Sequence, residues 1–175
     1  MAVNTYLTFF DDADGESGAI GHEQWIELRS WTWAVTSTVP THAGPGGGAG
    51  AGVGSGSGAG VATPTALRWE HGFDASSTRL LGFVATGRRL AKAELHVTRG
   101  GGHSGRDAWL AVIMRDLVIT SVSTSGASDG SVTQEVAMDF RSVTVEYRRQ
   151  LHTGSLATPA TFEWDIASGV ASTSP

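Results

Sequence analysis

The sequence predicts a mainly β protein: a small closed β-barrel with one short α-helix packed on it. Stretches rich in β-branched and aromatic residues alternate with clusters of Gly, Ser and Asp along most of the chain, a pattern typical of strands joined by turns. Only one segment has the apolar spacing of a helix. Two long strand-type segments also move their apolar residues from one face to the other, as strands do at bulges and barrel corners.

The first of these long segments covers residues 23–38 and follows a predicted strand over residues 5–9. Its apolar residues Ile26 and Leu28 share one face, whereas Trp31 and the apolar residues after it lie on the other face. A bulge or a sheet corner is therefore expected just before Trp31.

The second long segment covers residues 131–149 and changes face after Phe140. Between the two, residues 109–122 carry apolar side chains on both faces, so both faces of this predicted strand need cover. In a small barrel only the inward face is buried, so the outward set requires the helix or a neighbouring subunit. Further strands are expected over residues 92–98 and 161–165.

The helix is predicted over residues 76–86, with Asp74 or Ser76 as the N-cap and Gly87 as the C-terminal stop. Its apolar stripe consists of Leu80, Leu81 and Val84. About three turns are too few for a helix to be stable alone in water. The helix must therefore pack on the barrel.

The most biased part of the chain is a Gly-rich loop at about residues 42–61. Glycine loses the most backbone entropy on folding and has no side chain to bury, so this loop is expected to be flexible. No Lys follows the run of Gly, which argues against a phosphate-binding loop. We expect a single domain over residues 1–175 that contains this loop and ends in a short disordered tail at about residues 168–175.

The composition narrows the choice of partners. The chain has 175 residues, no Cys and a formal net charge of −5, and its 12 basic residues are dispersed, which argues against nucleic acid as a partner. Residues 1–7 have no basic leader and no long apolar stretch, so no secretory signal peptide is expected. The longest apolar run, residues 108–114, is far shorter than the about 20 residues that span a bilayer, so no membrane insertion is expected.

Patterns for catalysis or cofactor binding are weak throughout the sequence. The six His residues lack the spacing of common metal sites, and no Ser stands in a rigid strand-to-helix elbow. Gly100, Gly102 and Gly105 follow a predicted strand but precede another strand, so they are interpreted as a hairpin loop and not as a dinucleotide site. No enzymatic activity, catalytic residue, metal site or cofactor is predicted.

Short stretches spread over nearly the whole chain are similar to those of one known family. They are Gly15-Glu16-Ser17, residues 26–33, the Gly-rich loop, and residues 75–87, 92–101, 121–126, 143–147 and 162–165. In this order they resemble the Hcp family (hemolysin-coregulated protein), the tube proteins of bacterial type VI secretion systems.

The resemblance implies a structural subunit of the type VI secretion inner tube. It implies homohexameric rings that stack, secreted effector proteins carried in the pore, a contractile sheath around the tube and a VgrG spike at its tip. Assembly in the bacterial cytoplasm is expected, followed by secretion out of the cell or into target cells without a signal peptide. Because the sequence ends soon after Asp165, the C-terminal toxin domain of some members is not expected.

Two sets of residues are candidates for assembly. Through the resemblance, the Gly-rich loop is expected to contact the adjacent ring, with His42, Gly44, Gly46, Gly48, Gly50 and Gly60 as its candidate residues. The second set contains large apolar residues that are interpreted as barrel core or subunit interface. They are Trp31, Trp33, Trp109, Ile113, Leu117 and Ile119.

Two other functions stay open. A monomeric barrel lined by Trp and Phe side chains would bind a small apolar ligand, and native mass measurement distinguishes it from a ring. A hydrolase built from dispersed Ser, His and Asp residues is the second alternative, and a screen against esters and peptides tests it.

Overall fold

The computed structural model describes residues 3–38, 61–99 and 108–175. The elements in chain order are β1 (Val3–Thr8), the 3-10 helix η1 (Phe10–Asp12), β2 (Ile26–Thr32), β3 (Val35–Thr38), β4 (Val61–Pro64), β5 (Leu67–Gly72), α1 (Ala75–Thr86), β6 (Arg89–Arg99), β7 (Ala108–Gly126), β8 (Val132–Tyr147), β9 (Ala160–Asp165) and β10 (Val170–Ser174). Residues 42–60 of the predicted flexible loop, and the predicted hairpin loop at Gly100 to Gly105, lie outside the described residues.

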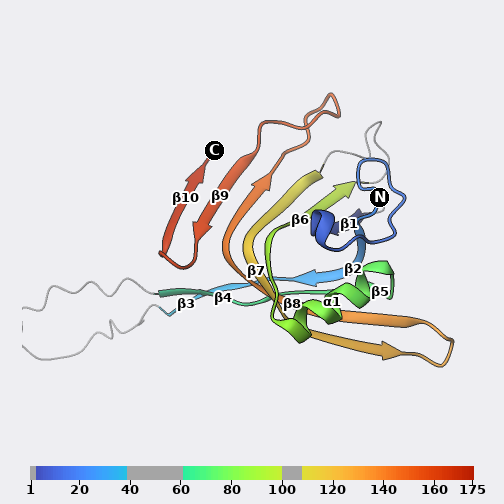
Figure 1. The fold of residues 1–175 in the computed structure, drawn as a ribbon. Coiled ribbons are helices and arrows are strands. Elements are labelled where there is room, and N and C mark those ends of the chain that lie inside the picture. Colours follow the sequence, from blue (N-terminus) through green and yellow to red (C-terminus); the bar gives the residue numbers. More distant parts are fainter. Residues whose placement is uncertain (1–2, 39–60, 100–107) are drawn as a thin grey trace, which may run out of the picture.

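Six strands close into a barrel. The main sheet has the order β10-β9-β8-β5-β2-β1-β6-β7, and β7 also pairs with β8, which closes the six strands from β8 to β7 into a ring. β9 and β10 are added to β8 outside this ring and form a sheet extension (Figure 1). The predicted class, a closed β-barrel with one helix, is confirmed.

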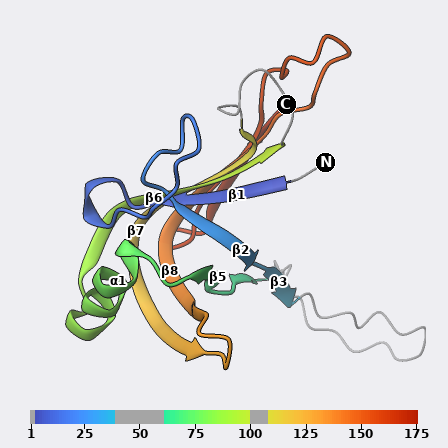
Figure 2. The same ribbon diagram turned by 90° about the vertical axis from the view of Figure 1, so that its right-hand side faces the viewer.

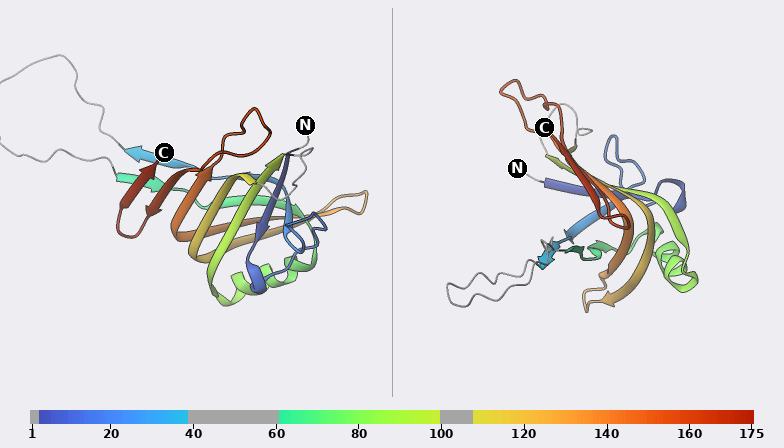
Figure 3. Two further views of the ribbon diagram at one scale, coloured as in Figure 1. Left: turned by 90° about the horizontal axis from the view of Figure 1, so that it is seen from above. Right: turned by 90° about the vertical axis from the view of Figure 1, so that its left-hand side faces the viewer.

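β8 changes its partner part-way along its length. Its residues up to Met138 pair with β5, whereas its residues from Ser142 onward pair with β9. This change falls where the sequence predicts a change of apolar face, so that pattern marks the point where β8 leaves the barrel wall. β7 follows the same bend, with a φ of 50° at Asp116 and a register shift between Ile119 and Ser121, and both strands curve strongly (Figure 3).

The strand predicted over residues 23–38 is in fact two strands in different sheets. β2 lies in the barrel between β1 and β5, and its register shift between Leu28 and Ser30 confirms the predicted bulge. β3 pairs with β4 in a two-stranded ribbon that projects from the barrel (Figure 1). The prediction of one continuous strand was wrong because Ala34 instead exchanges hydrogen bonds with Thr65 at the base of this ribbon.

The predicted disordered tail is also corrected by the structure. Residues 170–174 form β10, which pairs antiparallel with β9 along its whole length. The turn between the two strands has Gly169 at a φ of 71°, and the backbone N–H of Ser168 donates to the Asp165 carboxylate at 3.0 Å. The tail has few apolar residues, so its order comes from backbone pairing that hydrophobic periodicity does not report.

Helix α1 has the predicted caps. Asp74 is the N-cap, and Gly87 ends the helix in the left-handed conformation with a φ of 62°. α1 packs beside the curved strand β7 (Figure 2), where it buries Leu80 and Phe83. Leu81 was wrongly assigned to the apolar stripe, since it is 41% exposed.

Packed side chains from each of the six barrel strands fill the barrel interior. The fully buried examples are Leu7 in β1, Ile26 in β2, Leu67 and Trp69 in β5, Leu95 in β6, Met114 in β7 and Met138 in β8. All belong to one continuous apolar cluster, so a single core holds the barrel together.

Candidate assembly surface

The inner face of the barrel continues onto the sheet extension. Residues directly opposite each other in antiparallel strands share a face, so the strand registers define rows of side chains across β6, β7, β8, β9 and β10. One row consists of Leu95, Val112, Val145, Phe162 and Thr173, and the next of Val97, Leu110, Tyr147 and Ala160.

Burial decreases along these rows with distance from the barrel. Leu95 is 0% exposed and Val112 2%, whereas Val145 and Phe162 are only partly buried and Tyr147 is 45% exposed. We call the outer part of these rows the apolar wall. It comprises Leu110, Val145, Tyr147 and Phe162.

The opposite face of the same sheet is polar and charged. Its rows contain Lys92, Arg115, Ser142 and Asp165, and next to them Glu94, Ile113, Thr144, Glu163 and Ser172. The sheet extension therefore has one apolar face and one polar face, as expected for an antiparallel sheet with one face packed against other protein and the other face in contact with water.

The rim of the apolar wall is built from aromatic and strand-edge groups. Trp109 meets Tyr147 edge-on with ring centroids 6.0 Å apart, and the Arg99 guanidinium lies 5.1 Å from the Trp109 ring centroid. In the described part of the chain β10 pairs only with β9, so its outer edge presents unpaired backbone groups. Val170 at the start of this edge is 66% exposed and lies on the polar face, opposite Asp165.

The predicted core or interface residues divide into two groups. Leu117 and Ile119 are core residues, 0% and 2% exposed. The partly buried group, which packs on the edge of the core or lies on the polar face, consists of Trp31, Trp33, Trp109 and Ile113. The predicted stacking residues His42, Gly44, Gly46, Gly48, Gly50 and Gly60 lie outside the described residues.

The wall residues Tyr147 and Phe162 were not among the predicted interface residues. The alternation of apolar residues in the segment 131–149 placed Tyr147 in a strand, but it does not indicate which strand pairs with that segment. Only the β8–β9 register, with Val145 opposite Phe162, brings these side chains onto one surface.

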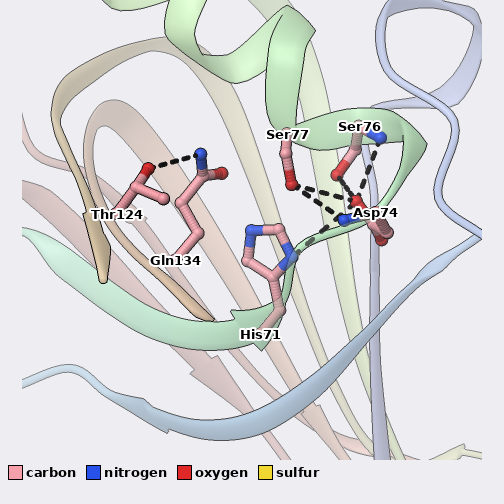
Figure 4. Close-up of polar contacts among 6 residues, drawn as sticks. All are labelled: His71, Asp74, Ser76, Ser77, Thr124 and Gln134. Carbon is pink, nitrogen blue, oxygen red and sulfur yellow. Dashed lines mark hydrogen bonds and ion pairs between the residues drawn. The ribbon is translucent and has the colours of Figure 1, made fainter. Parts of the chain in front are cut away.

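Ser, His and Asp side chains do come together, at the start of α1 (Figure 4). The Asp74 carboxylate accepts from the Ser76 backbone N–H at 3.0 Å and from the Ser76 and Ser77 hydroxyls at 2.5 and 3.4 Å. His71 Nδ1 lies 3.8 Å from the same carboxylate, and its side chain is fully buried. Burial lowers the pKa of His71, and Asp74 opposes this shift.

This cluster is a helix cap and not a nucleophile–base pair. Both hydroxyls donate to Asp74, neither His71 nitrogen has a hydrogen-bond partner, and Ser76 and Ser77 are 0% exposed. A nucleophilic Ser needs a base within hydrogen-bond reach and access to substrate. The geometry supports a structural role.

Replacement of Asp74 by Ala is expected to lower the free energy of unfolding by about 1–2 kcal/mol, because two buried Ser hydroxyls and a helix N–H lose their acceptor. Chemical denaturation measures this change. Asp74→Ser, which restores a capping oxygen, is the matched control and should recover most of the loss. Equal destabilisation by both variants would mean that the cap is not the source of the effect.

The described residues also limit other kinds of site. Among residues 3–38, 61–99 and 108–175, no group of three or more His, Asp or Glu side chains is arranged to hold a metal ion. No helix in this part of the chain is long and apolar enough to cross a membrane.

The fold and the wall define a small mainly β protein: a closed barrel that carries one helix and a sheet extension with one apolar and one polar face. Hcp1 from Salmonella typhimurium, a solved structure, is 26% identical, with coverage of 98% of this chain and 100% of that chain and a TM-score of 0.73. A solved type six secretion system protein is 22% identical with the same coverage and a TM-score of 0.82, a likeness that shows the shared fold.

The sequence comparisons agree with this fold. The family described as "Type VI secretion system effector, Hcp" matches residues 6–147. Protein Hcp1 of Pseudomonas aeruginosa is 26% identical over 99 residues, which are 55% of this chain and 60% of that protein's length. The chain belongs to the Hcp family of type VI secretion system proteins, which is a family of structural secretion proteins.

Proposed function

We propose that this chain is the repeating subunit of the type VI secretion inner tube. In this proposal six copies form a ring, rings stack into a tube, and the tube carries effector proteins in its pore and is itself secreted. Membership of the Hcp family supports the proposal. The contractile sheath and the VgrG spike are its proposed partners, and assembly takes place in the bacterial cytoplasm before secretion.

The observation that carries the proposal is the apolar wall. Tyr147 is 45% exposed beside the partly buried Val145 and Phe162, on a sheet whose other face is polar. Removing apolar area of this kind from water stabilises an assembly by about 25 cal/mol for each Å² that is buried. A second copy that covers the wall supplies this burial.

A ring can form when the surface that covers the wall is a different patch on the next copy of the chain. A contact between two different patches repeats from copy to copy and closes into a ring when the rotation allows it. We assign the contact within the ring to the apolar wall and the open edge of β10. We assign the contact between rings to the Gly-rich loop over residues 42–60, which continues from the projecting β3–β4 ribbon.

The alternative of a monomeric ligand-binding barrel has less support. The interior of the barrel contains Leu7, Trp69 and Met138, each 1% exposed or less and packed in one cluster. A ligand pocket needs a cavity of about 300 Å³ or more. Among the described residues, the cavities of this size, about 390 Å³ beside Asp74 and about 420 Å³ beside Val132, are open at the surface.

Tyr147→Glu is expected to leave the subunit folded but to prevent ring formation, because an unpaired charge would be buried at every contact around the ring. Native mass spectrometry should give six times the 18.2 kDa subunit mass for the unmodified protein and the single subunit for the variant. Negative-stain images should show annular particles only for the former.

Ser142→Glu is the matched control, because it adds the same charge to the polar face of the same strand, β8, opposite Arg115 and outside β10. It should assemble like the unmodified protein. Normal rings from Tyr147→Glu would exclude the wall as the contact but keep the tube proposal. Single subunits of the unmodified protein at high concentration would end the tube proposal itself.

A further inference from the structure

Four aromatic rings meet on the polar face of the barrel, where the β1–β2 connection (residues 9–25) folds back over β1 and β6. Tyr6 and His96 are directly opposite in the β1–β6 pair. The His22 ring stacks on Tyr6 with centroids 4.6 Å apart, and Trp25 contacts both His22 and His96 at 4.8 and 4.7 Å. The connection is therefore held to the sheet by side chains 74 residues apart in sequence.

The two His rings share one hydrogen bond. His22 Nε2 lies 3.0 Å from His96 Nδ1, so one of these nitrogens carries a proton and donates it in a hydrogen bond that the other nitrogen accepts. His22 Nδ1 is buried without a partner, and a buried N–H without an acceptor is costly. We therefore place the His22 proton on Nε2, which donates to His96 Nδ1.

This arrangement fixes the tautomer of the His96 ring as well. With Nδ1 as acceptor, neutral His96 carries its proton on Nε2, which lies 3.6 Å from the Glu94 carboxylate. A proton added to His96 Nδ1 would set two N–H groups against each other at 3.0 Å. A proton added to His22 Nδ1 would place a charge on a buried nitrogen that has no hydrogen-bond partner. The contact is stable only while both rings are neutral.

Charged groups from three segments surround the pair. They are Lys92 and Glu94 in β6, which pair with each other, Arg148 directly after β8, which pairs with Glu146, and Glu23 beside His22. Burial is the main cause that lowers the pKa of His96 to about 4, and His22, Arg148 and Lys92 add to it against Glu94. Burial also lowers the pKa of His22, against Glu23.

We infer that His22 and His96 form an acid-released latch, which holds the β1–β2 connection on β6 at neutral pH and frees it when the pair gains a proton. Release uncovers Tyr6, which is 4% exposed in the closed state, together with Trp25. The latch is a local device in the fold. It stands independently of the tube proposal, because it rests on the subunit alone.

Hydrogen–deuterium exchange of the whole protein at pH 7 and pH 4, corrected for the intrinsic pH dependence of amide exchange, tests the latch. Peptides over residues 13–25 should lose protection by about tenfold or more at pH 4 and should exchange faster there than peptides from β7 and β8, which open only with the whole subunit. His96→Asn retains an acceptor for His22 but does not titrate in this range. Its residues 13–25 should change by less than about twofold.

Two further variants make the outcomes distinct. His22→Phe keeps a ring against Tyr6 but removes the hydrogen bond, so residues 13–25 should already exchange fast at pH 7 and change little with acid. His152→Asn, at an exposed position, should behave like the unmodified protein. Unchanged protection at pH 4, equal loss in His96→Asn, or exchange of residues 13–25 that is no faster than that of β7 and β8 would each overturn the latch.

Discussion

Trp69→Ala is expected to lower the free energy of unfolding by about 3–5 kcal/mol, the largest effect of any single substitution proposed for this chain. Trp69 lies in the middle of β5, is 1% exposed, and packs against Phe9 with ring centroids 6.0 Å apart. Its indole nitrogen has no hydrogen-bond partner, so the loss comes from packing and the cavity left behind. Urea or guanidinium denaturation followed by circular dichroism measures it.

Trp31→Ala is the matched control. Trp31 stands directly opposite Trp69 in the β2–β5 pair, but its side chain is only partly buried. Its replacement should cost about half as much or less, because less apolar surface returns to water. Equal losses at the two positions would contradict the deeper burial of Trp69.

Acidification is expected to destabilise the subunit between pH 6.5 and about 4. Burial lowers the pKa of three His residues, His22, His71 and His96. Since the unfolded chain then binds more protons than the folded chain in this window, stability is fully present above pH 6.5 and falls as the pH decreases. For His96, a fall of the pKa from 6.5 to about 4 corresponds to about 3 kcal/mol of stability.

Denaturation curves at pH 7 and pH 4 measure this loss. In His96→Asn the difference between the two pH values should shrink by about 3 kcal/mol, whereas His152→Asn should leave it unchanged. The remaining loss is attributed to His22 and His71. A stability that stays constant from pH 7 to pH 4 would show that these rings are not held neutral by the fold.

Much of the barrel was predictable because strands and turns leave periodic signals. The change of apolar face before Trp31 marks a register shift in β2, and the change after Phe140 marks the point where β8 exchanges β5 for β9. The caps Asp74 and Gly87 placed α1 correctly, since each has a side chain or a backbone conformation suited to a helix end.

The errors arose where backbone pairing outweighed side-chain pattern. β10 is rich in Ser and Thr, so its sequence resembles a tail, yet its backbone completes a pair with β9. The predicted strand over residues 23–38 has continuous β character, but only the tertiary structure shows that β3 leaves the barrel to pair with β4.

Neither candidate site was visible as a motif. The apolar wall depends on which strands lie beside β8, and the latch joins His22 to His96 across 74 residues. No local spacing records such contacts. Sequence patterns could therefore indicate an excess of apolar strand surface but not its position.

The sequence by itself determined the class of fold, the single helix and the resemblance to the Hcp family, because these depend on local periodicity and on short stretches in a fixed order. The tertiary structure alone decided which apolar residues remain at the surface and which polar side chains meet, as with Tyr147 on the wall and His22 against His96. The physical reason is that burial and hydrogen bonding depend on distances through space, which strand register and curvature set after the local elements have formed.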